Sequence, residues 1–203
     1  MLSTSRSLAL TALIALASTT LAQNPTPPTP GRGGGGRGRT IQVMTLTSPG
    51  FSDGGAIPIK YSQAGPERSP ALAWHGAPDS IASFVLLVHD PDAATATGDD
   101  DMLHWLVWNI PATSQGLPEG VPQGAQLPDG TRQISVSGPY YRGPAAPSSG
   151  PPHHYVFELF ALDTMLDVAP VGAAPAATRA AVLTAMTGHV RGKAVAVGLF
   201  KRR

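Results

Sequence analysis

The close spacing of short apolar runs and turn residues constrains the fold of this chain more than any other feature. The 203 residues include 23 Gly and 21 Pro, and many of these stand between apolar runs too short for ordinary helices. Turn signals occur at 48–50 (Ser-Pro-Gly), 53–55 (Asp-Gly-Gly), 129–130 (Asp-Gly) and 137–139 (Ser-Gly-Pro). Short β-rich runs with turns at this density are typical of a β-sandwich or barrel.

Eight of these runs are predicted to be strands. Residues 84–88 and 105–108 are apolar on both alternating faces, which predicts that these two strands pass through the centre of a sheet. In the last run, Val195, Val197 and Leu199 alternate with Ala and Gly, which leaves a face of small residues for close packing. The predicted strands are 41–47, 57–62, 71–74, 83–89, 104–110, 133–137, 155–162 and 194–200.

One segment, 175–190, has the pattern of a helix. Val182, Leu183 and Met186 recur at helical spacing, Gly188 suits a C-terminal cap, and Thr178 is the candidate N-cap. The sequence therefore predicts a mainly β fold, an antiparallel sandwich with one or two short helices.

The first 22 residues have the pattern of a secretory signal peptide. Arg6 is the only charged residue among the first 31, an apolar run follows it, and small residues stand at 20–22, where a signal peptidase cleaves. We therefore expect export to the periplasm or the extracellular space after cleavage, with an uncleaved anchor as the alternative. The chain has no Cys, so neither a lipid-modified Cys nor a disulfide is available, and the domain depends on its core for stability.

Residues 23–39 are a low-complexity segment rich in Pro, Gly and Arg, which predicts a disordered linker before a single domain at 40–203. The alternative is an RGG-like segment that binds nucleic acid or an anionic surface. Four of the 14 basic residues lie before Thr40, so the domain carries ten Lys and Arg against all 13 Asp and Glu, a net charge of −3. This balance argues against a nucleic-acid-binding domain, which would show a basic face.

Polar residues are few within the apolar runs, and four of them are candidates for a common site. Asp90 follows one predicted central strand, and His104 begins the next. His153 and Tyr155 share a strand face by alternation, just after a loop rich in Gly, Pro and Ser. If these strands are neighbours, all four side chains converge at one end of the sheet.

Three separated stretches resemble the phosphatidylethanolamine-binding protein family, in its bacterial Raf kinase inhibitor-like branch. They begin with DPDA and HWLVWNIPA at 90–93 and 104–112, and continue with YRGPAAP and HHYVFELFALD at 141–147 and 153–163. The third is AMTGHVRGKAVAVGLFKR at 185–202, and the likeness extends from about Ile41 to the C-terminus. Two positions depart from the family pattern, Ala94 and Ala146, where the family usually has Pro.

The resemblance implies an antiparallel β-sandwich with Greek-key connections and a small anion-accepting pocket at one end. It implies that the pocket is non-catalytic and binds phosphate-bearing small molecules or phospholipid head groups, without a cofactor or metal. The positions that match the family's pocket residues are Asp90, His104, Gly143, Pro144, His153 and Tyr155.

Other functions remain open on the sequence alone. Family members are reported to restrain kinases or proteases, so an inhibitor acting on a protein target through its surface loops is the main alternative. A hydrolase or metal-dependent enzyme is a weaker one, because the chain has no Cys and no H-E-x-x-H, although Asp90, His104 and His153 could together bind zinc. We expect no stable membrane insertion, and a homodimer is compatible with the sequence.

Overall fold

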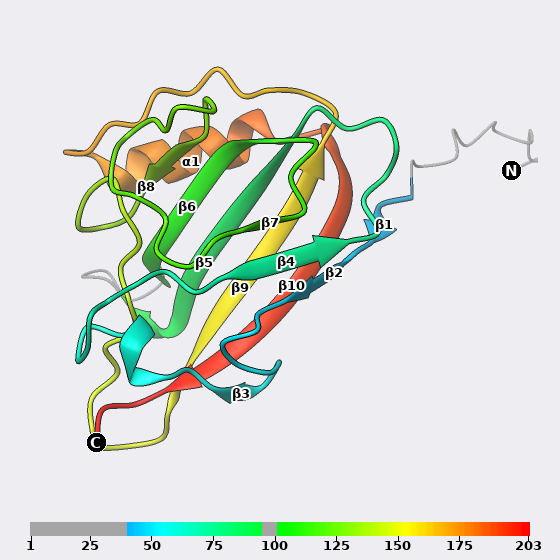
Figure 1. Cartoon of the computed structure of the whole chain (residues 1–203). Coiled ribbons are helices and arrows are strands. Elements are labelled where there is room, and N and C mark those ends of the chain that lie inside the picture. Colours follow the sequence, from blue (N-terminus) through cyan, green and yellow to red (C-terminus); the bar gives the residue numbers. More distant parts are fainter. Residues whose placement is uncertain (1–39, 95–100) are drawn as a thin grey trace, which may run out of the picture. The chain divides into compact units, whose positions relative to one another are not determined.

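The computed structural model describes residues 40–94 and 101–203, and the predicted signal peptide and linker lie outside the described residues. Within these ranges the fold is mainly β with one α-helix, as predicted, and its two sheets do not close into a barrel (Figure 1). The larger sheet has the order β1 (Gln42–Val43), β10 (Val190–Phe200), β9 (His153–Leu162), β5 (Ser83–Ala94), β6 (Asp101–Pro111), β8 (Arg132–Ile134), and β3 (Gly55–Ala56) also pairs with β10. The smaller sheet is β2 (Thr45–Thr47), β4 (Leu72–His75), β7 (Gly116–Leu117).

Four long strands form the centre of the larger sheet. The neighbours β5 and β6 pair antiparallel, as do β9 and β10, and β5 joins the two pairs by pairing antiparallel with β9. The short strands β1 and β3 depart from the predicted antiparallel arrangement, because both pair parallel with β10. Between them the chain crosses to the smaller sheet as β2 and then returns to the same edge of β10.

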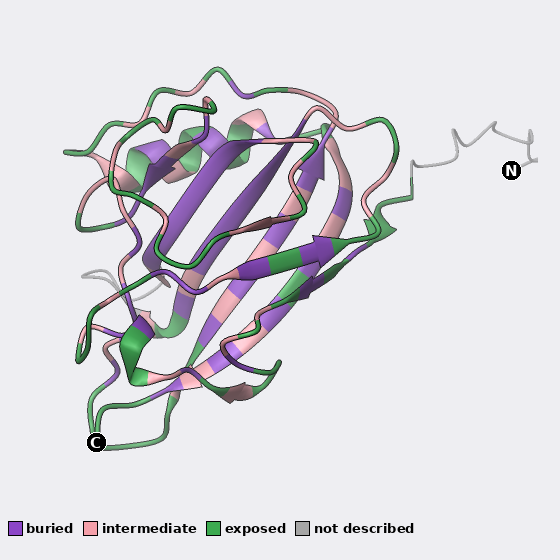
Figure 2. Cartoon of the chain, in the orientation of Figure 1, coloured by how far each residue is buried: buried purple, intermediate pink, exposed green. Residues whose placement is uncertain are grey.

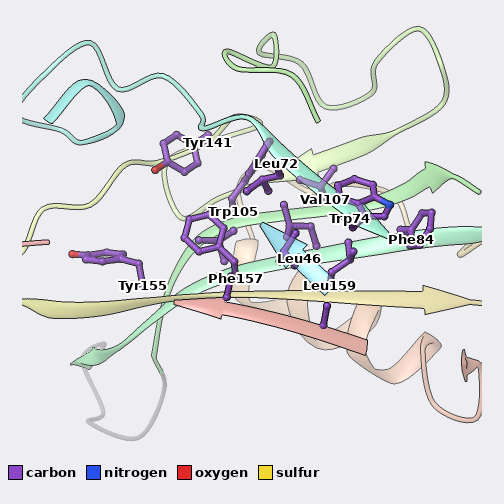
Figure 3. Packing of buried hydrophobic residues seen from close by; sticks show 14 of the residues in the cluster. Leu46, Leu72, Trp74, Phe84, Trp105, Val107, Tyr141, Tyr155, Phe157 and Leu159 are labelled. Atoms are coloured by element: carbon purple, nitrogen blue, oxygen red, sulfur yellow. The ribbon is translucent and has the colours of Figure 1, made fainter. Parts of the chain in front are cut away.

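The main core lies between the two sheets (Figure 3). Trp74 of the smaller sheet packs against Phe84 of the larger one, with ring centroids 5.3 Å apart. The predicted small-residue face of β10 is confirmed: Ala194 and Ala196 are buried in this core, and a Cβ atom at Gly198 would lie 2.4 Å from Ile57 Cγ1. Larger residues on this face would push the N-terminal segment off the sheet.

A second core covers the opposite face of the larger sheet. Helix α1 (Pro175–Ala185) contributes Val182, which packs with Met186 against a group of apolar side chains that includes Leu87 and Trp108. Burial on both faces makes β5 and β6 almost entirely buried over their central parts, as the sequence predicted (Figure 2). A strand pair held in this way is a rigid support for polar residues at its end.

Two local predictions were wrong. Residues 57–62 do not form a strand but contain the 3₁₀-helix η1 (Ile59–Tyr61), because Pro58 has no N–H for a ladder and the turn brings Tyr61 into the core. Helix α1 is not capped by Thr178 but begins at Pro175, whose fixed φ suits the first helical position. The Thr178 hydroxyl instead accepts from Val171 N–H and bonds to the Ala174 carbonyl. Among the described residues, no helix is long and apolar enough to span a membrane.

Candidate functional site

The structure brings the four predicted polar residues together at one end of the larger sheet. Asp90 lies on β5, His104 on β6, and His153 and Tyr155 at the start of β9. Because β5 lies between β6 and β9 in the sheet, the neighbouring ends of these three strands meet. We call these four side chains the polar cluster.

Asp90 is the hub of the polar cluster. It is only 2% exposed, and one carboxylate oxygen accepts from Asp92 N–H at 2.9 Å. The other lies 2.9 Å from His153 Nδ1. Since a carboxylate accepts, Nδ1 carries the proton and the carboxylate fixes the tautomer of His153. The buried charge is therefore satisfied by donors from two strands.

His104 is fixed by the backbone of the neighbouring loop. Its Nδ1 lies 2.8 Å from the Arg142 carbonyl oxygen, so this nitrogen donates and Nε2 holds the lone pair of the neutral ring. The ring also packs edge-on against Tyr155, with centroids 5.0 Å apart and planes at 83°. Burial lowers the pKa of His104, and the Arg142 guanidinium lowers it further, against the opposing effects of the Arg142 carbonyl and Asp90. The ring is therefore neutral at pH 7.

Tyr155 joins the polar cluster to the loop that follows β8. Its hydroxyl oxygen accepts from the N–H groups of Ala145 at 3.1 Å and Ala146 at 3.2 Å, which uses both of its lone pairs. Burial raises the pKa of Tyr155 to about 12, with a further contribution from the Asp90 carboxylate. The hydroxyl therefore keeps its proton and can act only as a donor. Figure 3 shows Tyr155 at one end of the core, with its hydroxyl pointing away from the packed side chains.

Gly143 and Pro144 are buried and hold the loop in place. Gly143 N–H donates to Glu67 Oε1 at 3.0 Å, and its carbonyl accepts from Gln63 Nε2 at 2.7 Å. The Pro144 carbonyl accepts from Gln63 N–H at 3.0 Å. A Cβ atom at Gly143 would lie 2.4 Å from the Tyr61 carbonyl oxygen, so only glycine fits against this backbone. These contacts give Gly143 and Pro144 a positioning role in the loop.

Sequence reasoning missed several residues that support the site. Glu67 and Gln63 lie far from the loop in sequence, and no local pattern connects them with it. Asp92 forms a second carboxylate–imidazole pair, in which its Oδ2 accepts from His154 N–H at 2.7 Å and lies 2.8 Å from His154 Nδ1. The bond from the His154 backbone lowers the pKa of Asp92. A sequence signal for this pair did exist. Two carboxylates, Asp90 and Asp92, stand near the end of one predicted strand, and two imidazoles, His153 and His154, stand near the start of another, so neighbouring strands can form two carboxylate–imidazole pairs.

Two other histidines, His89 and His189, form ion pairs outside the polar cluster. His89 forms ion pairs with Asp101 and, at 3.4 Å, with Glu158. Burial alone would lower the pKa of His89, but the two carboxylates raise it above its ordinary value. His189 pairs with Asp163 at 2.8 Å.

The zinc alternative gains no support from the geometry. In residues 40–94 and 101–203, no group of three or more His, Asp or Glu side chains is arranged to hold a metal ion. The two carboxylate oxygens of Asp90 instead accept hydrogen bonds from His153 Nδ1 and Asp92 N–H. The Nδ1 atom of His104 donates to the Arg142 carbonyl.

Comparison with known proteins gives one consistent result. The sequence profile of the phosphatidylethanolamine-binding protein family matches residues 47–201. A UPF0098 protein from Methanothermobacter thermautotrophicus is 43% identical over 161 residues, which cover 78% of this chain and 99% of the relative. The crystal structure of a phosphatidylethanolamine-binding protein homolog from Chlamydia trachomatis superposes with a TM-score of 0.66 at 32% identity, covering 79% of this chain and 99% of that one. The structure of Escherichia coli YbcL, described as a member of the mammalian PEBP family, gives 0.61 at 27% identity with the same coverage.

Proposed function

This chain belongs to the phosphatidylethanolamine-binding protein family, and on that basis we propose that its polar cluster binds a phosphate-bearing small molecule or phospholipid head group without converting it. The observation that carries the proposal is the buried Asp90 carboxylate holding His153 beside a buried neutral His104 and the Tyr155 hydroxyl. Nucleophilic catalysis gains no support, because the chain has no Cys and its G-x-S-x-G match, Gly50–Gly54, lies between the short strands β2 and β3 and not on the strand-to-helix turn that a nucleophile elbow requires.

The donors available to an anion are few and well defined. The Tyr155 hydroxyl has one proton to donate, for which a ligand would compete with the Asp90 carboxylate. Because the Nδ1 atom of His153 donates to Asp90, its Nε2 atom can donate to an anion only from the imidazolium form of the ring. Arg142, whose guanidinium is held by Ser137 Oγ at 2.6 Å, adds positive potential near His104. The site thus accepts the charge of a phosphate through two hydrogen bonds and one nearby cation.

The neutral His104 adds a requirement for a hydrogen on the ligand. Since its Nδ1 donates to the Arg142 carbonyl, its Nε2 can only accept. A protonated phosphate oxygen or an ammonium group satisfies this acceptor, whereas a fully ionised phosphate repels it. Phosphate monoesters lose their second proton near pH 6, so we expect binding to take up protons and to weaken as the pH rises above about 6.

The expected affinity is modest. Charge-assisted hydrogen bonds contribute about 1.5–3 kcal/mol each before ordering and desolvation costs are subtracted. Two or three such bonds correspond to a dissociation constant in the roughly micromolar to millimolar range for a bare head group. A dissociation constant in this range corresponds to weak, readily reversible binding.

We further propose that the chain acts outside the cytoplasm. The support is the signal-peptide pattern of residues 1–22 and the tether-like composition of residues 23–39. Partner modulation by the loops around the site, inhibition of a protease or kinase, and homodimer formation stay predictions. Capture of a periplasmic protein with and without excess phosphoethanolamine would distinguish a pocket-mediated contact from one made elsewhere.

Isothermal titration calorimetry tests the proposal. Inorganic phosphate, phosphoethanolamine and short-chain phosphatidylethanolamine are each titrated into the wild type, His104→Ala and His75→Ala, the last removing an exposed imidazole outside the cluster. We expect saturable binding of the phosphate-bearing ligands to the wild type and the His75 variant, and at least tenfold weaker binding to His104→Ala. Equal heats for all three proteins would overturn the proposal.

A further inference from the structure

A hollow lies beside the polar cluster, since its lining includes Pro152, which precedes His153 in the chain, and Phe200, which pairs with His153 across β10 and β9. It has a volume of about 740 Å³ and lies between the η1 region and the end of β10, near the C-terminus marked in Figure 1. Its apolar part is formed by Ala and Pro residues together with Ile57, Ile59, Leu199 and Phe200. Its volume falls within the range of about 300–1,000 Å³ that is common for small-molecule sites.

One end of this groove is strongly basic. Lys201, Arg202 and Arg203 are exposed and line it, and no Asp or Glu is among the lining residues. In the described part of the chain, no carboxylate forms an ion pair with any of these three side chains. The backbone N–H of Arg202 donates to the Ala146 carbonyl at 3.0 Å, which fixes this segment beside the groove. A ligand that joins a negative charge to an apolar part would complement both the basic end and the apolar part of this groove.

We propose that this groove binds a single-chain anionic amphiphile, with its alkyl chain over Ile57 and Phe200 and its carboxylate or phosphate against Arg202 and Arg203. The composition of the lining favours an alkyl chain over a peptide. It contains no Ser, Thr, Asn, Gln or acidic side chain, and both of its prolines lack an N–H. A peptide buried there would leave backbone polar groups without partners, which is costly, whereas an alkyl chain needs none.

The linker of this chain is a poor occupant. Residues 23–39 carry Arg32, Arg37 and Arg39 and no acidic residue, so the charged end of the groove would repel them. The proposed groove also uses none of the residues of the polar cluster, so this inference does not rest on the proposed function.

A calorimetric chain-length series tests the proposal. Octanoate, decanoate and dodecanoate are titrated into the protein below their micelle concentrations, with decyltrimethylammonium as the oppositely charged comparison. Each buried methylene should tighten binding by roughly fourfold, so decanoate should bind roughly tenfold or more tightly than octanoate. Decyltrimethylammonium should bind at least tenfold more weakly than decanoate at low salt. Equal binding of the two head groups, or no dependence on chain length, would overturn the proposal.

Two surface variants locate the binding. Ile59→Asp places a carboxylate in the groove, and Val171→Asp makes the same kind of change at an exposed site outside it; the two residues are 58% and 50% exposed, so neither is needed for the core. We expect Ile59→Asp to weaken decanoate binding at least tenfold and Val171→Asp to leave it unchanged. Inorganic phosphate should bind Ile59→Asp as it binds the wild type, because Ile59 is not part of the polar cluster, and this separates the proposal from the proposed function.

The same variants report on other occupants. If Ile59→Asp leaves decanoate binding intact, the groove is not the site. If an acidic apolar peptide binds the wild type while decanoate does not, the groove is a peptide site and the proposal fails. Sedimentation could instead show that the wild type is a dimer. If Ile59→Asp dissociates this dimer and added decanoate does not, a second copy of the chain covers the groove and the proposal also fails.

Discussion

Replacing Gly143 with alanine should loosen the loop that supports the polar cluster. The new Cβ atom would lie 2.4 Å from the Tyr61 carbonyl oxygen and 2.9 Å from Ser62 Cα, where ordinary contacts begin near 3.4 Å. Backbone surrounds the new methyl group, so relief requires the loop to move by about 1 Å. The bonds from Ala145 and Ala146 to the Tyr155 hydroxyl are already 3.1 and 3.2 Å long and would break with such a movement.

The expected cost follows from these two bonds. A neutral hydrogen bond contributes about 0.5–1.5 kcal/mol, so their loss removes about 1–3 kcal/mol, the same range as overpacking a core. We therefore expect Gly143→Ala to lower the free energy of unfolding by about 2 kcal/mol, which corresponds to a Tm lower by about 4–8 °C. Urea and thermal unfolding followed by circular dichroism measure both quantities.

Gly172→Ala is the matched control. This glycine has an ordinary φ, and no atom lies within 4 Å of the position that a new methyl group would take, so the substitution should be neutral or stabilise by up to about 1 kcal/mol. If Gly143→Ala and Gly172→Ala unfold alike, the close packing of the loop does not support the site and the reasoning is refuted.

Three further predictions concern stability and pH. His89 has a raised pKa, so the stability that it contributes is complete below about pH 6.5 and is lost as the pH rises through the raised value. Urea unfolding at about pH 6 and about pH 8.5 should therefore show a difference in free energy of unfolding between the wild type and His89→Gln that shrinks at the higher pH. A difference that stays constant would contradict this. The pKa of Glu158 is lowered to about 2, chiefly by its bond from His89, so its contribution is lost as the pH falls from about 4.5 toward about 2, and Glu158→Gln should be less acid-sensitive than the wild type in the same assay. Tyr141→Phe removes the 3.0 Å bond to the buried Tyr61 carbonyl and should cost about 1–3 kcal/mol in thermal unfolding; an unchanged Tm would show that this bond contributes nothing.

Much of the fold was predictable because the long strands have continuous or alternating apolar patterns. The segments 83–89, 104–110, 155–162 and 194–200 all lie within long strands of the larger sheet. The failure at 57–62 has a local cause, since Pro58 cannot complete a ladder and the burial of Tyr61 depends on packing that no local pattern encodes. Tertiary contacts decide such short segments.

The candidate site was predictable only in part. The convergence of Asp90 and His153 follows from the pairing of β5 with β9, which the sequence left as a condition and the structure supplies. The anchors of the loop, Glu67 and Gln63, come from a distant segment and satisfy backbone groups of the loop by geometry alone. The acceptor character of His104 also could not be predicted, because it depends on one backbone carbonyl. Sequence thus identified the polar side chains but not their protonation pattern.

The most direct test of the central claim is imidazole NMR during a titration with phosphoethanolamine. The ring nitrogen and proton signals of all six histidines can be followed in one ¹⁵N-labelled sample. We predict saturable shifts of His104 and His153, a slow-exchanging Nδ1 proton on His153 toward Asp90, and little change at His75 and His189. Shifts confined to the other histidines, or none at any concentration up to about the millimolar range expected for such a site, would contradict the account.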